Sequence, residues 1–239
     1  MREYIAAARR FGGAAMGELL GPQPTGPDTE AWSADEAGDY CPRCGASVDE
    51  TGQTPRGCPF CVGQHLAWHR LVRLRAYAEP MQGWIVSSKF GGQWRWATAL
   101  GRRLGERVAP LATEQRSVVC AVPMHWARRW RRGYNQAELM ARAMADVLGA
   151  PTVPLLHRTR YTRPQTVVAP SQRRQNVRDS VAAAAVDLSG WTVWLVDDVK
   201  TSGATLTQCA RLLREAGAVM VNVAVLAVAD PKGGDFTRI

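Results

Sequence analysis

The sequence predicts an α/β fold, a twisted parallel sheet flanked by helices, with a small cysteine-rich module in front of it. Apolar runs rich in β-branched residues lie at 117–122, 193–196 and 219–228, as expected of strands that are buried on both faces. Segments with helical spacing of apolar residues alternate with these runs, which favours parallel strands joined by helices. Two Cys-x-x-Cys pairs upstream mark the separate module.

The length of the chain and its net charge limit the kinds of protein that this sequence can encode. A chain of 239 residues can bury one good core and carry a small appendage. The net charge of +9 comes mostly from arginine and favours anionic partners, either phosphorylated small molecules or nucleic acid. No run of about 20 apolar residues and no signal-peptide pattern occurs, so we expect no membrane span and a cytoplasmic location. The oligomeric state stays open.

Composition divides the chain into four parts. We expect an N-terminal helix and an acidic flexible linker at 1–40, the cysteine module at 41–65, the α/β domain at 66–230 and a tail at 231–239. The helix is a weakly amphipathic pattern over residues 2–20. Residues 21–40 hold three prolines and five acids without a basic residue, which is typical of a mobile linker.

The two cysteine pairs predict a metal site. In a chain without an export signal, this pattern indicates a metal rather than disulfides. Thirteen residues separate the pairs, a spacing that can bring four thiolates to one tetrahedral Zn²⁺ with a structural role. His65 and His69 can replace a cysteine ligand, although surface positions are more typical of them, and four unrelated thiols are the other reading. The predicted ligands are Cys41, Cys44, Cys58 and Cys61.

Within the α/β domain the order of elements follows from periodicity, caps and glycines. Asn135 is expected to cap a helix that Gly149 ends, and Gly217 is expected to end the last helix. The expected strands lie near 71–77, 117–122, 152–156, 179–186, 193–197 and 219–228, and the expected helices near 79–88, 93–109, 135–148 and 205–216.

The stretch 193–206 carries the main candidate site. Asp197 and Asp198 stand where the strand is expected to end, and a loop of small and hydroxyl residues, 201–205, leads into a helix. Loop amides, hydroxyls and the helix dipole can hold a phosphate, while the carboxylates suit sugar hydroxyls or a metal that bridges to them. The predicted ligand is a phosphorylated sugar with free vicinal hydroxyls. An ordinary strand–turn–helix connection with surface acids is the alternative.

Two arginine-rich segments are further candidates. Four arginines occur within residues 128–132, just after the strand that ends near Pro123, and can bind phosphate oxygens. A solvated basic surface or a nucleic-acid patch is the alternative reading. Residues 157–178 hold six arginines without apolar periodicity, which suggests a basic lid over a polyphosphate or plain disorder.

The Asp-Asp-Val-x-Thr-Ser-Gly-Ala-Thr loop resembles the PRPP-binding motif of type I phosphoribosyltransferases. With the other motifs, residues 41–228 resemble the ComF family of competence-associated phosphoribosyltransferase-like proteins. The remaining matching pieces are the double Cys-x-x-Cys, Lys89-Phe90, Val122-Pro123, Arg128, Arg132-Gly-Tyr-Asn-Gln-Ala, Leu156-x-Arg158, Gln165 and Arg173-x-x-Asn176. The chain departs from the family pattern at Ser202, where Thr is usual, and at Ala121, Val168-Ala169 and Val181.

The resemblance implies a type I phosphoribosyltransferase-like fold that binds PRPP with Mg²⁺. It implies catalytic roles for Asp197, Asp198 and Arg158. The residues implied for the 5′-phosphate are Thr201, Ser202, Gly203, Ala204 and Thr205, and those for pyrophosphate and a covering hood are Pro123, Arg128, Arg132, Gln165, Arg173 and Asn176.

Two functions follow from this resemblance. The first is Mg²⁺-dependent transfer of a phosphoribosyl group to an unknown acceptor, linked to DNA uptake and natural transformation or to nucleotide metabolism. The second is a non-catalytic PRPP- or nucleotide-binding module of the DNA-uptake machinery that contacts single-stranded DNA, a helicase or a recombination partner.

Overall fold

The central sheet has four parallel strands in the order β1-β6-β5-β2. The computed structural model describes residues 26–27, 32–49, 56–113, 116–158 and 181–230. The strands are β1 (Arg70–Ala76), β2 (Ser117–Ala121), β5 (Thr192–Lys200) and β6 (Met220–Val228). Residues 151–153 run beside β2 through a parallel bridge between Val119 and Thr152. The predicted parallel α/β sheet is confirmed.

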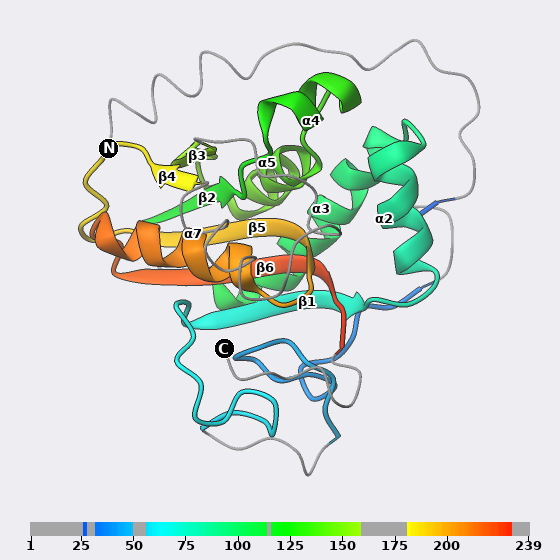
Figure 1. Ribbon diagram of the computed structural model, residues 1–239. Helices are drawn as coiled ribbons and strands as arrows, with labels where there is room; N and C mark the ends of the chain where they lie inside the picture. Colours follow the sequence, from blue (N-terminus) through cyan, green and yellow to red (C-terminus); the bar gives the residue numbers. More distant parts are fainter. Residues whose placement is uncertain (1–25, 28–31, 50–55, 114–115, 159–180, 231–239) are drawn as a thin grey trace, which may run out of the picture.

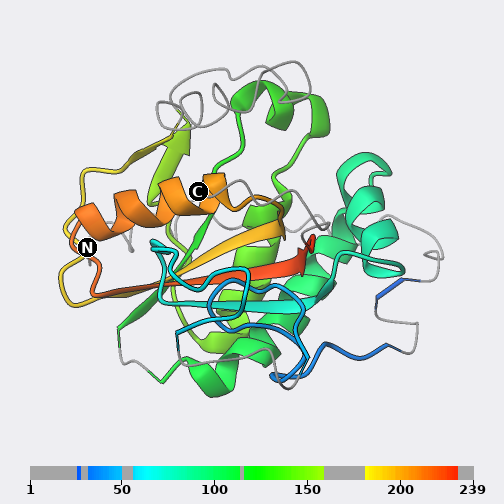
Figure 2. The ribbon, with the colours of Figure 1, turned by 60° about the horizontal axis from the view of Figure 1, so that its bottom comes forward.

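Helices cover both faces of this sheet (Figures 1 and 2). One face packs against α2, α3 and α5, and the other packs mainly against α7. The helices are α2 (Met81–Phe90), α3 (Trp94–Val108), a 3-10 turn η1 (Ala109–Leu111), α4 (Trp126–Arg132), α5 (Gln136–Leu148) and α7 (Ala204–Glu215). Asn135 caps α5 by accepting a hydrogen bond from the amide of Ala137 at 3.2 Å, and Gly149 ends it with a φ of 63°, both as the sequence predicts.

Strand β5 shows why the sheet is buried on both sides. Val193 and Leu195 belong to the core beneath α7, whereas Trp194 and Val196 belong to the core beneath α2, α3 and α5. All four side chains are buried. A strand that must bury successive side chains on opposite faces needs a continuous apolar run, which is the pattern in the sequence.

Four predicted features differ in detail. The predicted strands near 152–156 and 179–186 instead contribute β3 (Leu156–Arg158) and β4 (Val181–Ala183), which pair antiparallel with each other outside the main sheet. Strand β5 does not end at the acids but continues to Lys200, because β6 pairs with it as far as Val228. The arginine cluster after β2 forms helix α4, consistent with the high helix propensity of arginine.

The described part of the acidic segment contacts the sheet and the helices beside it. The amide of Asp35 donates to the carbonyl of Leu74 at 2.7 Å, and Trp32 packs edge-on against Trp84 with ring centroids 5.5 Å apart. The expected helix at 2–20 and the tail at 231–239 lie outside the described residues. No helix of the described ranges combines the length and the apolar character needed to cross a membrane.

Candidate functional site

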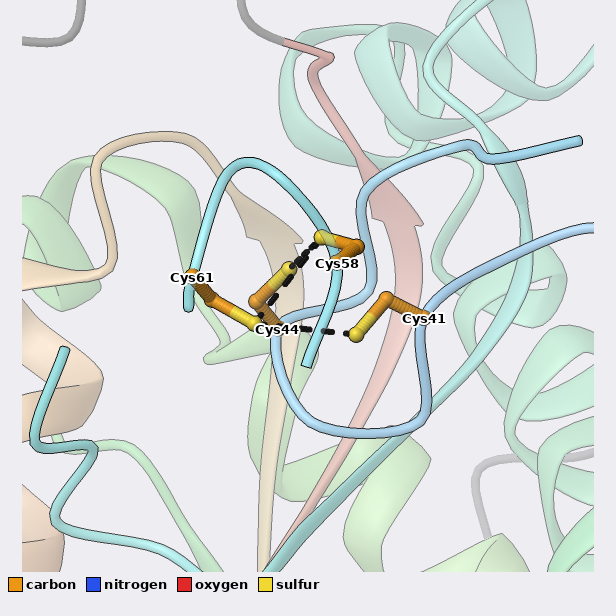
Figure 3. A group of neighbouring side chains, drawn as sticks. All are labelled: Cys41, Cys44, Cys58 and Cys61. Carbon is orange, nitrogen blue, oxygen red and sulfur yellow. Dashed lines mark hydrogen bonds between the residues drawn. The ribbon is translucent and has the colours of Figure 1, made fainter. Parts of the chain in front are cut away.

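The four cysteines of the two pairs form one cluster (Figure 3). Their sulfur atoms all lie within 4.8 Å of one another, and all four side chains are buried. Cys41 Sγ lies 3.7 Å from Cys61 Sγ, and Cys44 Sγ lies 3.5 Å from Cys58 Sγ. His65 and His69, which the sequence offered as substitutes for a cysteine ligand, are both exposed. The arrangement brings together the four sulfurs that the spacing predicts.

The cluster fits a tetrahedral zinc ion. Four sulfurs at about 2.3 Å from Zn²⁺ stand about 3.8 Å apart, close to the separations found here. A hydrogen bond shared with Cys41, together with burial, raises the pKa of the Cys44 thiol, and burial raises the pKa of Cys61 to about 11. Sulfurs crowded in this way cannot all ionise unless a cation balances them. The donor set therefore suits a structural zinc site.

A buried arginine ties the cysteine module to the edge of the sheet. Arg73 of β1 is 1% exposed and forms an ion pair of 2.7 Å with Asp35. It also donates to the carbonyl of Gly45 at 2.7 Å and to Ser47 Oγ at 2.8 Å. Gly45 has a φ of 79°, and a Cβ there would lie 2.4 Å from Leu71. Because glycine has no Cβ, the backbone of the module lies closer to Leu71 of β1 than any other residue at position 45 would allow.

The two acids lie near the carboxyl end of β5, at the same edge of the sheet as the N-terminus of α7. Since side chains alternate along a strand, Asp197 continues the α7 side and Asp198 the α2 side. Asp198 Oδ2 lies 2.9 Å from the ammonium of Lys89 in the last turn of α2. The neighbouring acids therefore face different partners and different layers of the protein.

Asp197 has an unusual titration. Burial, followed by the neighbouring charge of Asp198, raises its pKa to about 7, although a hydrogen bond from the Asp198 amide at 2.9 Å favours the ionised form. Lys89 and Arg158 also favour ionisation but do not offset the burial. A carboxyl that titrates near neutrality beside a second carboxyl is typical of functional sites.

The loop after β5 forms a small pocket of about 60 Å³. Asp197, Val199 and the loop residues Lys200–Leu206 line it. Gly203 has a φ of 77° and directly precedes α7, and the amide of Thr207 is bonded to its carbonyl at 2.8 Å. The amides of the first turn before Thr207 are the ones that an α-helix leaves without helical acceptors. The residues that carry these amides line the pocket, and a helix N-terminus of this kind suits an anion such as phosphate.

Basic residues predicted for the pyrophosphate gather beside the acids. Arg158 Nε donates to the carbonyl of Pro123 at 3.1 Å, and Arg158 and Asp197 lie close enough to affect each other's pKa. Arg132 is half-buried, with its guanidinium 4.7 Å from the ring centroid of Phe90, and the charge of Asp198 acts on its pKa. Arg128 is exposed on α4. The hood residues Gln165, Arg173 and Asn176 lie outside the described residues.

Sequence reasoning gave no role to two residues of this region. Lys89 was noted only as part of the family motif that the sequence resembles. The chain contains three lysines, Lys89, Lys200 and Lys232, so a lysine at this position is in itself unusual. His125, at the start of α4, is 5% exposed, and burial, followed by the charges of Arg158 and Arg128, lowers its pKa. The spacing of residues along the chain gave no signal for either, because the contact of Lys89 with Asp198 and the burial of His125 both depend on tertiary packing.

Comparison with known proteins agrees with this geometry. Residues 135–237 match the family described as the phosphoribosyl transferase domain. Together with the parallel sheet and the acidic loop, this match defines a phosphoribosyltransferase-like protein. Competence protein F of Haemophilus influenzae is 32% identical over 193 residues, which cover 77% of this chain and 82% of the relative. The chain belongs to the competence protein F (ComF) family.

Other relatives carry related names. DNA utilization protein YhgH of Escherichia coli K12 is 31% identical over 190 residues, covering 77% of this chain and 81% of the relative. Competence protein ComFC of Bacillus subtilis is 24% identical over 75% of this chain and 73% of its own length. A solved structure of the allosteric regulatory enzyme of purine biosynthesis covers 54% of this chain and 25% of its own at 28% identity, with a TM-score of 0.37. The family assignment rests on the sequence relatives.

Proposed function

We propose that the protein binds PRPP together with Mg²⁺ and transfers its phosphoribosyl group to an acceptor. The observation that carries this proposal is the pocket at the N-terminus of α7, which is lined by Asp197 together with the loop residues Lys200–Leu206. A ribose 5-phosphate unit needs this combination, since amides and hydroxyls bind the phosphate and carboxylates accept hydrogen bonds from the ribose hydroxyls.

The proposed roles divide along the ligand. Residues 201–205 hold the 5′-phosphate, while Asp197 and Asp198 accept the 2′- and 3′-hydroxyls and stabilise the positive charge that develops at C1. The backbone from Val122 to Met124, with Arg158 and the arginines of α4, meets the pyrophosphate. In the transfer the bond between C1 and the pyrophosphate oxygen breaks, and the acceptor forms the new bond to C1. The positive groups stabilise the departing pyrophosphate.

Two metal ions complete the proposal. Mg²⁺ supplies charge neutralisation between the ribose hydroxyls and the pyrophosphate when it is bound with PRPP. The cysteine cluster holds a structural Zn²⁺, for which its sulfur separations and burial are the support. The zinc has no part in the transfer.

The names of the relatives suggest the biological setting. They are called competence and DNA utilization proteins, and on this basis we propose a role in DNA uptake and natural transformation. Nucleotide metabolism is the alternative setting for a PRPP-dependent transferase. Release of pyrophosphate in the presence of nucleobases or of DNA would distinguish the two acceptor classes.

A thermal-shift series with PRPP tests the ligand. Wild type with Mg²⁺ and PRPP is expected to unfold at a higher temperature than with Mg²⁺ alone, because a ligand that binds only the folded state stabilises it. The Asp197→Asn/Asp198→Asn variant is expected to lose this shift. Inorganic phosphate serves as a control for simple anion binding. A wild type that PRPP does not stabilise would rule out the proposal.

A second candidate function has one specific observation in its favour. Helix α4 projects beyond the sheet in both views (Figures 1 and 2) and exposes Trp126 and Trp130, which are 72% and 88% exposed. Residues four apart lie on the same side of a helix, and arginines surround this pair. Exposed aromatic rings among positive charges suit the bases and phosphates of single-stranded DNA.

The two candidates make different predictions. A single-stranded DNA module binds an oligonucleotide with a strong salt dependence, and the Trp126→Ala/Trp130→Ala variant loses that binding while Asp197→Asn/Asp198→Asn keeps it. A transferase releases pyrophosphate from PRPP, which a module does not. Oligonucleotide binding that the tryptophan variant leaves intact would exclude α4 as the contact.

A further inference from the structure

The ion pair between Lys89 and Asp198 lies inside the candidate site. Lys89 Nζ is 2.9 Å from Asp198 Oδ2, and the two side chains are 22% and 17% exposed. Both groups are more shielded than a surface pair, so their attraction is less screened by water and salt. Lys89 comes from α2, whereas Arg158 comes from β3, Lys200 from β5 and the remaining arginines of the site from α4.

The turn that precedes α5 fixes the end of α2. Tyr134 Oη donates to the carbonyl of Ser88 at 2.5 Å, and Gln136 Nε2 donates to the same carbonyl at 3.2 Å. The side chain of Asn135 donates to the carbonyl of Val122 at 3.3 Å, at the end of β2. Because Ser88 directly precedes Lys89, these bonds fix the backbone from which the ammonium reaches Asp198. Residues 134–136 therefore act as supports for the site.

The charges explain why such a support is needed. Two adjacent carboxylates repel each other, and both would repel the pyrophosphate of the proposed ligand. Within the ranges that the structure describes, Lys89 is the cation in direct contact with Asp198. An ammonium is a compact charge with three rotatable donors, so it can contact Asp198 and also turn toward a ligand oxygen, which a planar guanidinium does less easily. Lysine at this position in an arginine-rich chain fits that use.

We propose that Lys89 is a positioning residue of the sugar-phosphate site, which holds Asp198 ready for a ribose hydroxyl and offsets its charge toward the pyrophosphate. The inference rests on the proposed binding of PRPP. It assigns to a protein side chain part of the charge neutralisation that Mg²⁺ would otherwise have to supply. Removal of the ammonium should therefore make PRPP binding more dependent on Mg²⁺.

The test is PRPP binding by calorimetry across a series of Mg²⁺ concentrations. Lys89→Gln is expected to lose affinity on the order of tenfold at low Mg²⁺ and to recover most of it at saturating Mg²⁺. Lys89→Arg, which keeps the charge, is expected to stay closer to wild type. Mg²⁺ alone is expected to bind Lys89→Gln more tightly than wild type, since the acid pair has then lost its internal cation.

Arg102→Gln is the matched control, since it removes one positive charge from an exposed position on α3. An affinity loss in Lys89→Gln that is the same at all Mg²⁺ concentrations would indicate a merely structural lysine and overturn the inference. Equal shifts in Lys89→Gln and Arg102→Gln would also overturn it, as an effect of net charge. A wild type that does not bind PRPP at any Mg²⁺ concentration contradicts the proposed function itself.

Discussion

The flank of the sheet at β1 and the carboxyl edge around β5 both concentrate charge, but they balance it differently. At the β1 flank, Arg73 is enclosed by Asp35 and by acceptors of the cysteine module, so positive and negative groups meet within the protein. At the carboxyl edge, like charges stand side by side. Asp197 adjoins Asp198, and the arginines of α4 are mostly exposed.

The difference separates groups that hold the fold from groups held ready for a ligand. A buried ion with complete internal partners is costly to disturb, because removing one partner leaves the other uncompensated. Like charges held together reduce stability and persist where a ligand uses them. Removing a charged group at the β1 flank should therefore reduce stability, whereas removing one of the acids at the carboxyl edge should reduce binding and leave stability unchanged or improved.

Loss of the metal should have the largest effect on stability. Cys41→Ser and Cys58→Ser are each expected to lower the zinc content from one per chain to near zero, and to destabilise the cysteine module by more than about 5 kcal/mol, because metal binding supplies folding free energy. Metal analysis and hydrogen exchange of the module measure this. Cys209→Ala, in the core beneath α7, should keep its zinc. Full zinc content in both serine variants would show that the cluster is not the metal site.

Substitution of Arg73 should have the second-largest effect on stability. Arg73→Met keeps much of the side-chain volume but leaves Asp35 without its closest cation, and an unfolding free energy lower by about 3–5 kcal/mol is expected in denaturant titrations. Asp35→Asn in the same chain should recover part of the loss. Arg128→Met removes an exposed arginine from the open edge and should change stability by less than about 0.5 kcal/mol. Equal losses at the two arginines would remove the contrast between the two regions.

The same contrast explains what the sequence could and could not predict. The strands of the main sheet, the caps at Asn135 and Gly149, and the four-cysteine cluster follow from local patterns, because periodicity, capping and Cys-x-x-Cys spacing act over a few residues. The contacts of Arg73 and Lys89 could not be predicted in this way. Their partners lie 38 and 109 positions away along the chain, at Asp35 and Asp198, and depend on how the layers pack.

Asp197→Asn should raise stability at neutral pH. The carboxyl titrates near 4 in the unfolded chain and near 7 in the folded protein, so the folded protein binds more protons between these values. Stability therefore falls as the pH rises from about 4 to 7, and the penalty is complete above pH 7. The neutral side chain in Asp197→Asn does not ionise, so the variant does not carry this stability penalty.

We expect Asp197→Asn to gain about 1–3 kcal/mol at pH 8 and almost nothing at pH 4, since water reaches part of this half-buried carboxyl. Denaturant titrations at the two pH values measure the gain. Asp146→Asn, at an exposed position of α5, should change stability by less than about 0.5 kcal/mol at both. A destabilised Asp197→Asn at pH 8 would place Asp197 among the groups that hold the fold.

Gly203→Ala should have the smallest effect on stability and the sharpest one on the pocket. The φ of 77° is strained for any residue with a Cβ, at a cost of about 1 kcal/mol. A Cβ there would also lie 3.2 Å from the side chain of Lys200, which lines the same pocket and would have to move by a few tenths of an ångström. Gly190→Ala is the matched control, with a φ of 78° outside the pocket and a similar expected cost. Since both glycines share the backbone strain, only a change within the pocket can make Gly203→Ala lose PRPP affinity while Gly190→Ala keeps it. Equal affinities in the two variants would argue against phosphate binding at the start of α7.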